Sequence, residues 1–330
     1  MSKQREQHHK NRHVSDLISR IKESADKLEK QGSTRGDLKI ISRAMRELAY
    51  AFKVFTPYRR YRKVTIFGSA RTKPDHPTYQ MAVDFGRAMA EQDWLVITGA
   101  AAGIMEAGHV GAGREHSMGL NILLPFEQDA NPIIAGDEKL VHMKYFFTRK
   151  LMFVKECDAV VCLPGGFGTL DEAMEVLTLN QTGKHDPVPV VFLDAPGGTY
   201  WKMFDEFMRK ELLDGGMISP EDTSLYLVTD DCREAVNECV DFYRVYHSMR
   251  YVREQLVLRL RSPLSDDHLS RIQTEFADIV VDGTIEQVDA LPEEKNEPDL
   301  GQMKRLCFQF DRRNLARLRL LIDEINQPAG

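Results

Sequence analysis

The chain has 330 residues, of which 42% are hydrophobic and 28% charged, and its formal net charge is −6. This composition is typical of a soluble globular protein, and the length suffices for one sizeable α/β domain and a smaller unit. The negative balance offers no basic surface for nucleic acid, and no apolar run approaches the length of a membrane span. We therefore expect neither nucleic acid nor a membrane as a partner.

The cysteines and the start of the chain indicate a cytoplasmic protein. The five cysteines are an odd number without a C-x-x-C pair, so we expect reduced thiols. Residues 1–13 are polar and lack the apolar core of a signal peptide. No His, Cys or Asp cluster has the spacing of metal ligands, and we predict neither a metal nor a cofactor.

Two helices are predicted at the N-terminus, over residues 14–30 and 38–55, because apolar residues recur there at helical spacing. One apolar stripe of the second helix contains Ile41, Met45, Leu48, Phe52 and Phe55. We assign residues 1–57 to a helical N-terminal segment and expect this stripe to pack on its own domain or on a second copy of the chain.

Short β-rich runs then alternate with helical stretches. The predicted strands are 64–69, 94–99, 118–123, 159–163 and 188–193, with a sixth candidate at 226–228. The predicted helices are 77–92, 104–114, 147–157 and 233–249, with a further helix after the glycine-rich turn that follows residue 163. A long connection containing Pro125 and Pro132 follows the third strand. Such alternation predicts a doubly wound, mostly parallel α/β sheet over residues 58–249.

The pattern changes after residue 249. The predicted elements are a strand at 251–260, a helix at 265–279, strands at 284–291 and 303–310, and a final helix at 313–325. This βαββα order suits a small α+β domain of residues 250–330. We expect it to be regulatory or oligomerising, and a plain packing appendage is an equal alternative.

The most informative stretch is residues 160–172, VVCLPGGFGTLDE, which reads as a buried strand, a tight loop and the start of a helix. Such a junction aims backbone N–H groups and the positive end of the helix dipole at one point, which suits a phosphate. We place Glu172 in the first helical turn, facing the ligand. The alternative is a plain tight turn with a favourable helix charge.

Small residues end other predicted strands as well. Gly68 and Ser69 end the first strand, and Gly99 ends the second. Ligands of doubly wound sheets bind outside the carboxyl ends of the strands, so this clustering favours a phosphate site. Arg149 and Lys150 lie among aromatic and aliphatic residues, where an unpaired buried cation is costly. Either both side chains extend along the helix surface, or Arg149 reaches this crevice and holds a nucleotide.

Together these residues resemble the R-K…P-G-G-x-G-T-x-x-E signature of the LONELY GUY proteins, which are often mislabelled lysine decarboxylases. The resemblance covers residues 63–242. Members of that family are Rossmann-like phosphoribohydrolases that split a nucleoside 5′-monophosphate into free base and ribose 5-phosphate. The resemblance implies that Arg149 and Glu172 form the catalytic pair, and it implies oligomerisation. The phosphate loop that it implies consists of Gly165, Gly166, Gly168 and Thr169.

Two further family motifs are altered in this chain. Gly99, Gly103 and Met105 fall where the family has G-G-G-x-x-G-x-M-G, but three alanines separate the glycines and Glu106 replaces the last glycine. Glu106 is either an acceptor for base or sugar or a helix charge. The family's W-A-Q-x-G-x-H appears as residues 179–185, LNQTGKH, without the aromatic, which argues against a cytokinin-type base pocket. Both changes resemble longer bacterial relatives that act as general purine-nucleotide nucleosidases.

The chemistry of N-glycosidic cleavage fits these residues. Positive charge develops on the ribose, and a nearby carboxylate stabilises it and orients water at C1′. We assign this role to Glu172, while the loop and Arg149 anchor the phosphate. We predict hydrolysis of AMP or an N6-modified AMP by a homo-oligomer. The expected substrate-binding residues are Gly68, Ser69, Gly99, Gly103, Met105, Glu106, Lys150, Gly165, Gly166, Gly168 and Thr169.

Two alternatives remain at this point. A non-catalytic carrier or sensor of a nucleotide or of molybdenum cofactor would need the phosphate loop but not the acid, so the presence of both Arg149 and Glu172 favours the enzyme. Amino-acid decarboxylation would need a pyridoxal-phosphate lysine, for which the sequence gives no independent support. His185 is a further candidate for the rim of the pocket.

Overall fold

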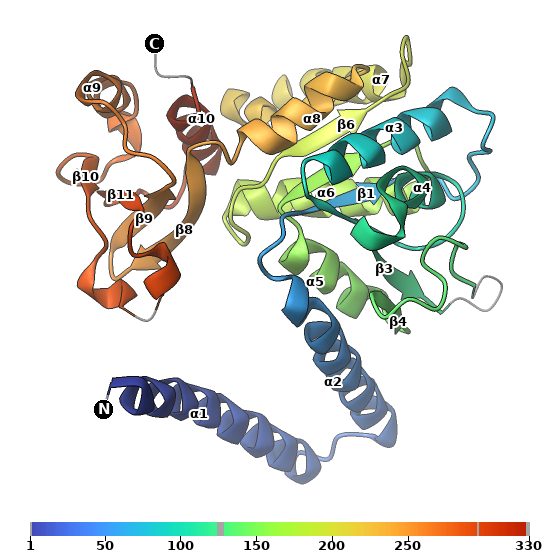
Figure 1. Ribbon diagram of the computed structural model, residues 1–330, viewed down its shortest axis with the longest axis horizontal. Coiled ribbons are helices and arrows are strands. Elements are labelled where there is room, and N and C mark those ends of the chain that lie inside the picture. Colours follow the sequence, from blue (N-terminus) through green and yellow to red (C-terminus); the bar gives the residue numbers. More distant parts are fainter. Residues whose placement is uncertain (1, 124–128, 296, 328–330) are drawn as a thin grey trace.

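A parallel sheet of seven strands forms the centre of the computed structural model, which describes residues 2–123, 129–295 and 297–327 (Figure 1). The strands are β1 (Lys63–Phe67), β2 (Leu95–Thr98), β3 (Ser117–Ile122), β4 (Leu140–Met143), β5 (Ala159–Cys162), β6 (Val190–Leu193) and β7 (Leu227–Thr229). Their order is β4-β3-β2-β1-β5-β6-β7, with parallel pairing throughout. The predicted doubly wound α/β fold is confirmed, and the winding reverses between β1 and β5.

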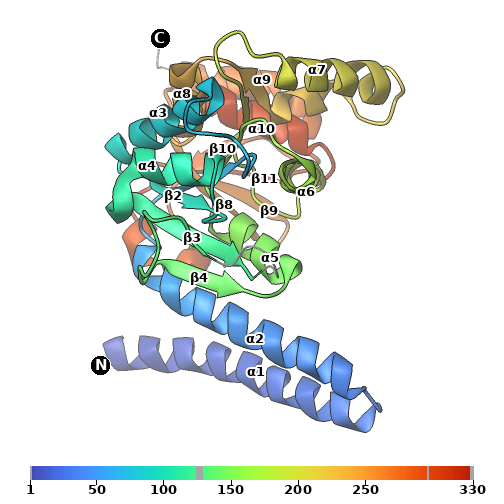
Figure 2. The same cartoon turned by 90° about the vertical axis from the view of Figure 1, so that its right-hand side faces the viewer.

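Helices cover both faces of this sheet (Figure 2). One face packs against α3 (Pro77–Glu91), α4 (Ile104–His116) and α8 (Cys232–Asp241). The other face packs against α2 (Arg35–Phe55), α5 (Phe146–Glu156), α6 (Phe167–Thr182) and α7 (Tyr200–Phe207). The strands are therefore apolar on both sides, which is why they read as continuous hydrophobic runs in the sequence. Shorter helical turns lie at Thr56–Tyr58, Met208–Leu213, Pro220–Leu225, Ala277–Ile279, Pro292–Glu294 and Pro298–Leu300.

Strand β4 was not predicted. It is short, its outward-facing His142 is exposed, and it lies in what reads as a long connection between β3 and α5. It nevertheless completes the sheet edge beside β3, pairing Gly119 with Leu140 and Ile122 with Met143. Of the two prolines in this connection, Pro125 lies outside the described residues.

The second sheet is antiparallel and has the order β10-β11-β9-β8. Its elements are β8 (Tyr246–Val252), β9 (Gln255–Leu260), α9 (Asp266–Glu275), β10 (Glu286–Val288), β11 (Lys304–Phe308) and α10 (Leu315–Ile325). Apolar side chains of β9, β11 and α10 join the same core cluster as β1, β5 and α3.

The prediction of a single helix over residues 233–249 was wrong. Helix α8 ends at Asp241, and the chain enters β8 at Tyr246. Buried Phe242, Tyr243 and Tyr246 have spacing that suits a helix, but their rings pack against one another where the chain turns into the sheet. Residues 251–260 do not form one strand as predicted. They belong to the hairpin of β8 and β9, which turns at Arg253 (φ 55°), so the order is ββαββα instead of βαββα.

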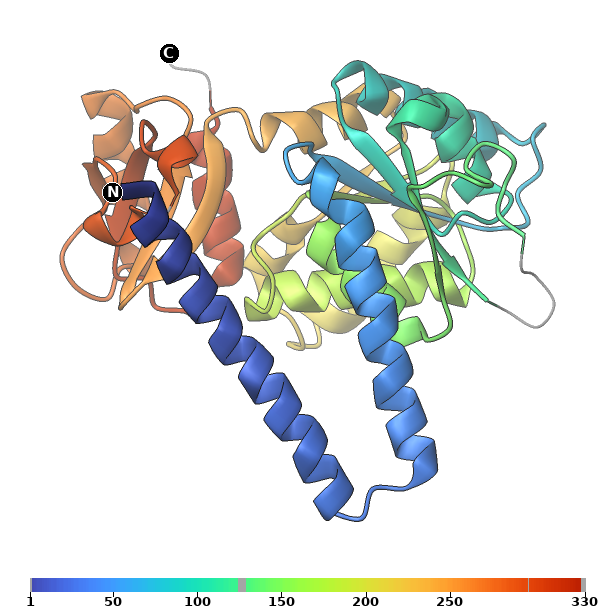
Figure 3. The ribbon, with the colours of Figure 1, turned by 60° about the horizontal axis from the view of Figure 1, so that its bottom comes forward.

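The N-terminal segment consists of α1 (Ser2–Lys30) and α2, which diverge from their connecting loop (Figure 3). Helix α1 begins earlier than predicted, and its described side chains are largely exposed. Of the predicted stripe on α2, Phe55 is buried and Ile41, Met45 and Phe52 are exposed. The stripe therefore packs on the domain only near its C-terminal end.

Glu47 fixes α2 to the start of α5. Its buried carboxylate accepts hydrogen bonds from the Thr148 hydroxyl (2.9 Å) and the Lys144 N–H (3.0 Å), and it pairs with Arg43. Burial raises the pKa of Glu47, but its hydrogen bonds to Arg43, Lys144 and Thr148 together outweigh burial and lower it. Because Thr148 precedes Arg149, this contact orients the helix that carries Arg149.

We predict that Glu47→Ala lowers the free energy of unfolding by about 1–3 kcal/mol, because it leaves the Lys144 N–H without its acceptor and removes the bond from the Thr148 hydroxyl, which then donates only to the Tyr145 carbonyl. Urea denaturation at neutral pH measures this, with Glu29→Ala on the exposed face of α1 as the control. Equal stability of Glu47→Ala and the control would contradict the anchoring role.

Candidate active site

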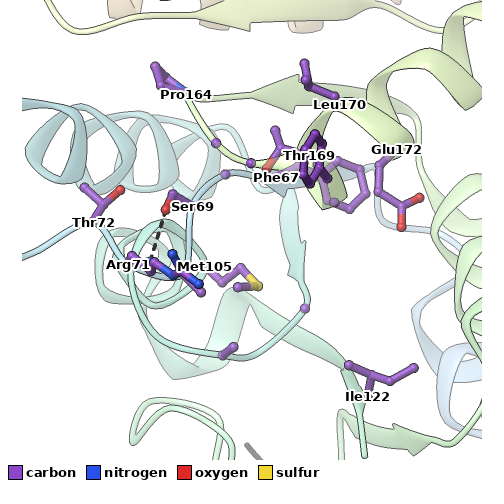
Figure 4. A pocket seen from close by; sticks show the side chains of 18 of the residues that line it. Phe67, Ser69, Arg71, Thr72, Met105, Ile122, Pro164, Thr169, Leu170 and Glu172 are labelled. Carbon is purple, nitrogen blue, oxygen red and sulfur yellow. Dashed lines mark hydrogen bonds between the residues drawn. The ribbon is translucent and has the colours of Figure 1, made fainter. Parts of the chain in front are cut away.

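A cavity of about 990 Å³ opens at the carboxyl ends of β1, β2 and β5, where the winding of the sheet reverses. Figure 4 shows the Glu172 carboxylate at one side of this cavity and Ser69 and Arg71 at the other. Ligands of doubly wound sheets bind at this point of the fold. The cavity therefore has the position and size of a small-molecule site.

The β5–α6 loop forms one wall of the cavity. Gly166 precedes α6 and supplies no side-chain cap to the first amides of the helix, which leaves them available to an anion. A Cβ on Gly165 would lie 2.1 Å from the Thr169 hydroxyl and 3.0 Å from the Ser69 nitrogen, so only glycine fits there. A Cβ on Gly166 or Gly168 would meet nothing within 4 Å, because both residues border the open cavity.

The loops after β1 and β2 pack tightly against this wall. The Ser69 N–H donates to the Pro164 carbonyl (3.2 Å), and the Ile104 N–H donates to the Ser69 carbonyl (3.0 Å). Gly103 has φ 67°, and a Cβ there would lie 2.3 Å from the Ser69 oxygen. Gly103 thus lets the two loops approach each other, and it does not itself line the cavity.

Arg149 approaches the cavity from α5. Its guanidinium carbon lies 5.2 Å from the Phe146 ring centroid and 5.6 Å from that of Phe153. Its Nε is buried and has no hydrogen-bond partner among the described residues. Burial lowers the pKa of Arg149, and the nearby charge of Glu172 opposes that shift. Arg149 is therefore a half-buried cation with unused donor capacity at a site suited to an anionic ligand.

Glu172 is only 5% exposed. We predicted Glu172 in the first turn of this helix. Because α6 begins at Phe167, Glu172 lies in the second turn instead. Burial raises its pKa, while the positive charges of Lys150 and Arg149 partly oppose this rise. The Lys150 Nζ lies 3.3 Å from Oε2 of Glu172. This carboxylate is thus desolvated, faces the cavity and has basic neighbours.

The structure brings most of the predicted site residues together. The predicted residues that line the cavity are Gly68, Ser69, Gly99, Met105, Arg149, Gly165, Gly166, Gly168, Thr169 and Glu172. Besides Gly103, the predicted residues Glu106 and Lys150 do not line it. Glu106 lies on α4, where its charge acts on Tyr79.

The cavity is also lined by residues that the sequence did not single out, among them Arg71, Thr72 and His76. Their signal was their position between Ser69 at the end of β1 and the start of α3, which His76 caps. His185 and Leu179 line a different cavity, of about 720 Å³, beside β8, so His185 is not at the rim of the first one. Within the described ranges, no group of His, Cys, Asp and Glu side chains is arranged to hold a metal ion.

The fold and the site define a Rossmann-like α/β protein with a glycine-rich loop at a helix N-terminus and a buried carboxylate on one cavity. A family model described as "possible lysine decarboxylase" matches residues 99–239. Cytokinin riboside 5′-monophosphate phosphoribohydrolase LOG3 of Arabidopsis thaliana is 32% identical over 192 residues, which cover 56% of this chain and 84% of the relative. The chain belongs to this family, the LONELY GUY phosphoribohydrolases.

Other known proteins are similar over about half of the chain. The cytokinin riboside 5′-monophosphate phosphoribohydrolase of Mycobacterium tuberculosis is 28% identical over 171 residues, covering 48% of this chain and 84% of the relative. A solved structure of the molybdenum cofactor binding protein from Rippkaea orientalis is 16% identical, with a TM-score of 0.38, over 54% of this chain and 94% of that chain. Among the described residues, none of the helices combines the length and hydrophobicity of a membrane span.

The raised pKa of Glu172 predicts a stability cost near neutral pH. The folded state binds the proton of Glu172 more tightly than the unfolded chain does. The resulting contribution to the free energy of unfolding is fully present below the ordinary carboxyl pKa and is lost as pH rises through the raised pKa. Glu172→Gln is permanently neutral, and we expect it to unfold at a higher temperature than the wild type at about pH 8, with the difference shrinking toward about pH 4.

Thermal unfolding across this pH range, with exposed Glu254→Gln as the control, measures the effect. A pH-independent difference between Glu172→Gln and the wild type would contradict the raised pKa.

Proposed function

We propose that the protein hydrolyses the N-glycosidic bond of a purine nucleoside 5′-monophosphate, AMP or an N6-modified AMP, to free base and ribose 5-phosphate. The observation that carries this proposal is that a glycine loop at a helix N-terminus and the carboxylate of Glu172 line one cavity. The first element suits a phosphate and the second suits a developing sugar cation.

The spacing along α6 supports one substrate bridging both features. From Phe167 to Glu172 the helix advances by roughly 7–8 Å at about 1.5 Å per residue. That is about the length of ribose 5-phosphate. A phosphate held at the start of α6 would therefore place the ribose beside Glu172, with Arg149 offering donors to the same ligand.

In the proposed reaction, the C1′–N bond breaks while positive charge develops on the ribose ring, and the ionised Glu172 stabilises that charge. A water oxygen forms the new bond to C1′, Glu172 accepts a proton from this water, and the departing base takes up a proton from solvent. Phosphate binding remote from C1′ supplies the energy that holds the sugar in place.

General purine use is proposed over strict cytokinin use. The relatives named above are cytokinin riboside 5′-monophosphate phosphoribohydrolases. In this chain the aromatic residue of the family's W-A-Q-x-G-x-H motif is replaced by Leu179, and that segment lines the other cavity.

The cytoplasmic location and the homo-oligomer stay predictions. Exposed apolar side chains favour the N-terminal helices as the contact between copies, among them Val14, Leu17, Ile18, Ile21, Ile40, Ile41 and Met45.

The activity is tested by incubating the full chain with a panel of nucleoside monophosphates and measuring free base and ribose 5-phosphate. We expect release from AMP, and a loss of at least about a hundredfold in kcat for Glu172→Gln, since transition-state stabilisation is removed. Glu115→Gln, exposed at the end of α4, is the control.

Undiminished release by Glu172→Gln would refute the role of Glu172. Tight nucleotide or molybdenum-cofactor binding without release from any substrate would instead favour a carrier.

The two glycines of the loop should respond differently to alanine. Gly165→Ala forces its Cβ against Thr169 and should cost about 1–3 kcal/mol of stability. Gly168→Ala meets no protein atom, so stability should be kept, but its methyl group would occupy the ligand's approach and raise KM for AMP by on the order of tenfold. Denaturation curves and initial rates measure both, and an unchanged KM in Gly168→Ala would argue against a phosphate at this loop.

A further inference from the structure

Lys150 follows Arg149 on α5 but points elsewhere. Its Nζ lies 2.7 Å from Oε2 of Glu175, 2.9 Å from Oδ2 of Asp171 and 3.3 Å from Oε2 of Glu172. Its side chain is 17% exposed and borders the second cavity, beside β8, and not the one that Arg149 lines. The ammonium therefore sits behind the proposed catalytic carboxylate, on the side away from the ligand.

We propose that Lys150 is a positioning residue that keeps Glu172 ionised and directed into the cavity, rather than a residue that binds substrate. This inference rests on the proposed function, because it concerns the state of the acid that the reaction needs. It replaces the expectation, drawn from the sequence, that Lys150 contacts the nucleotide.

The electrostatic surroundings of Glu172 support this role. A carboxylate this deeply buried becomes neutral unless a positive charge stands close by. Among the described residues, Lys150 is the one cation at ion-pair distance from Glu172, and Arg149 acts on it from farther away. Two acidic groups also lie near Glu172. The charge of Glu175, on the same helix, disfavours ionisation of Glu172, and the thiol of Cys162 lies on β5.

Lys150 itself remains charged in this environment. Burial lowers its pKa, but hydrogen bonds to Glu175 and Asp171 outweigh burial and raise the pKa above its ordinary value. Asp171 and Glu175 are more exposed than Glu172, with side chains 63% and 34% accessible against 7%. These two acids therefore secure the lysine, while they compete with Glu172 for it.

The competition gives two variants with opposite expected effects on the acidic limb of the kcat–pH profile. Lys150→Met removes the positive charge, so Glu172 protonates more easily and the limb moves to higher pH. Below the limb, kcat then falls about tenfold for each pH unit of displacement. Glu175→Gln removes a competitor and a like charge, so the limb moves to lower pH.

The full-length variants are assayed with AMP across pH, with Lys150→Arg as the conservative rescue, which should return the limb toward the wild-type position. Lys155→Met, on the same helix but paired with Glu156, is the control and should leave the limb in place. KM should change little in Lys150→Met. A raised KM with an unmoved limb would overturn the inference in favour of substrate binding.

A second readout separates this inference from the proposed function. The chemical shift of the Glu172 side-chain carboxyl carbon, followed by NMR in labelled protein, reports its titration whether or not the protein turns over. Glu172→Gln identifies the signal, and thermal unfolding shows that each variant is folded. An unchanged midpoint in Lys150→Met would overturn the inference even in an active enzyme, whereas a moved midpoint in a protein that releases no base would support it and refute only the hydrolase.

Discussion

The site depends on keeping one buried carboxylate charged beside a loop that attracts anions. Glu172 is 5% exposed, and burial alone would favour its neutral form. Lys150 and Arg149 are neighbours on α5, and they approach Glu172 from different sides. Lys150 contacts the carboxylate from behind, and Arg149 lines the ligand cavity together with it. The packing of α5 against the sheet, fixed in part by Glu47 on α2, thereby sets the charge state of the acid.

The sheet topology places these helices where a ligand can reach them. The winding reverses between β1 and β5, so the loops after these strands meet, and glycines allow the contact. Gly165 and Gly103 allow neighbouring protein segments to pack closely, because a side chain at either position would clash. Gly166 and Gly168 border open space. A glycine-rich motif therefore has two kinds of glycine, of which one builds the loop and the other leaves room for the ligand.

Much of this could be predicted from the sequence, because buried parallel strands leave long apolar runs and their ends are marked by glycines. The β5 strand, its loop and the position of Glu172 followed from such local signals, whereas the position of Arg149 in the cavity followed from the family resemblance. Long-range packing decided the rest. The aromatic residues after α8 suited a helix but turn into β8, β4 gains its partner only from β3, and the partners of Lys150 on α6 became apparent only once α5 and α6 were placed side by side.

In the proposed complex, one ribose 5-phosphate spans from the start of α6 to residue 172. A crystal structure of Glu172→Gln with AMP bound tests it most directly, because the neutral variant should hold the substrate without cleaving it. We expect the phosphate on the amides of residues 166–168 and the C1′ atom facing the side chain of residue 172. A phosphate bound elsewhere, or a ribose turned away from that side chain, would contradict it.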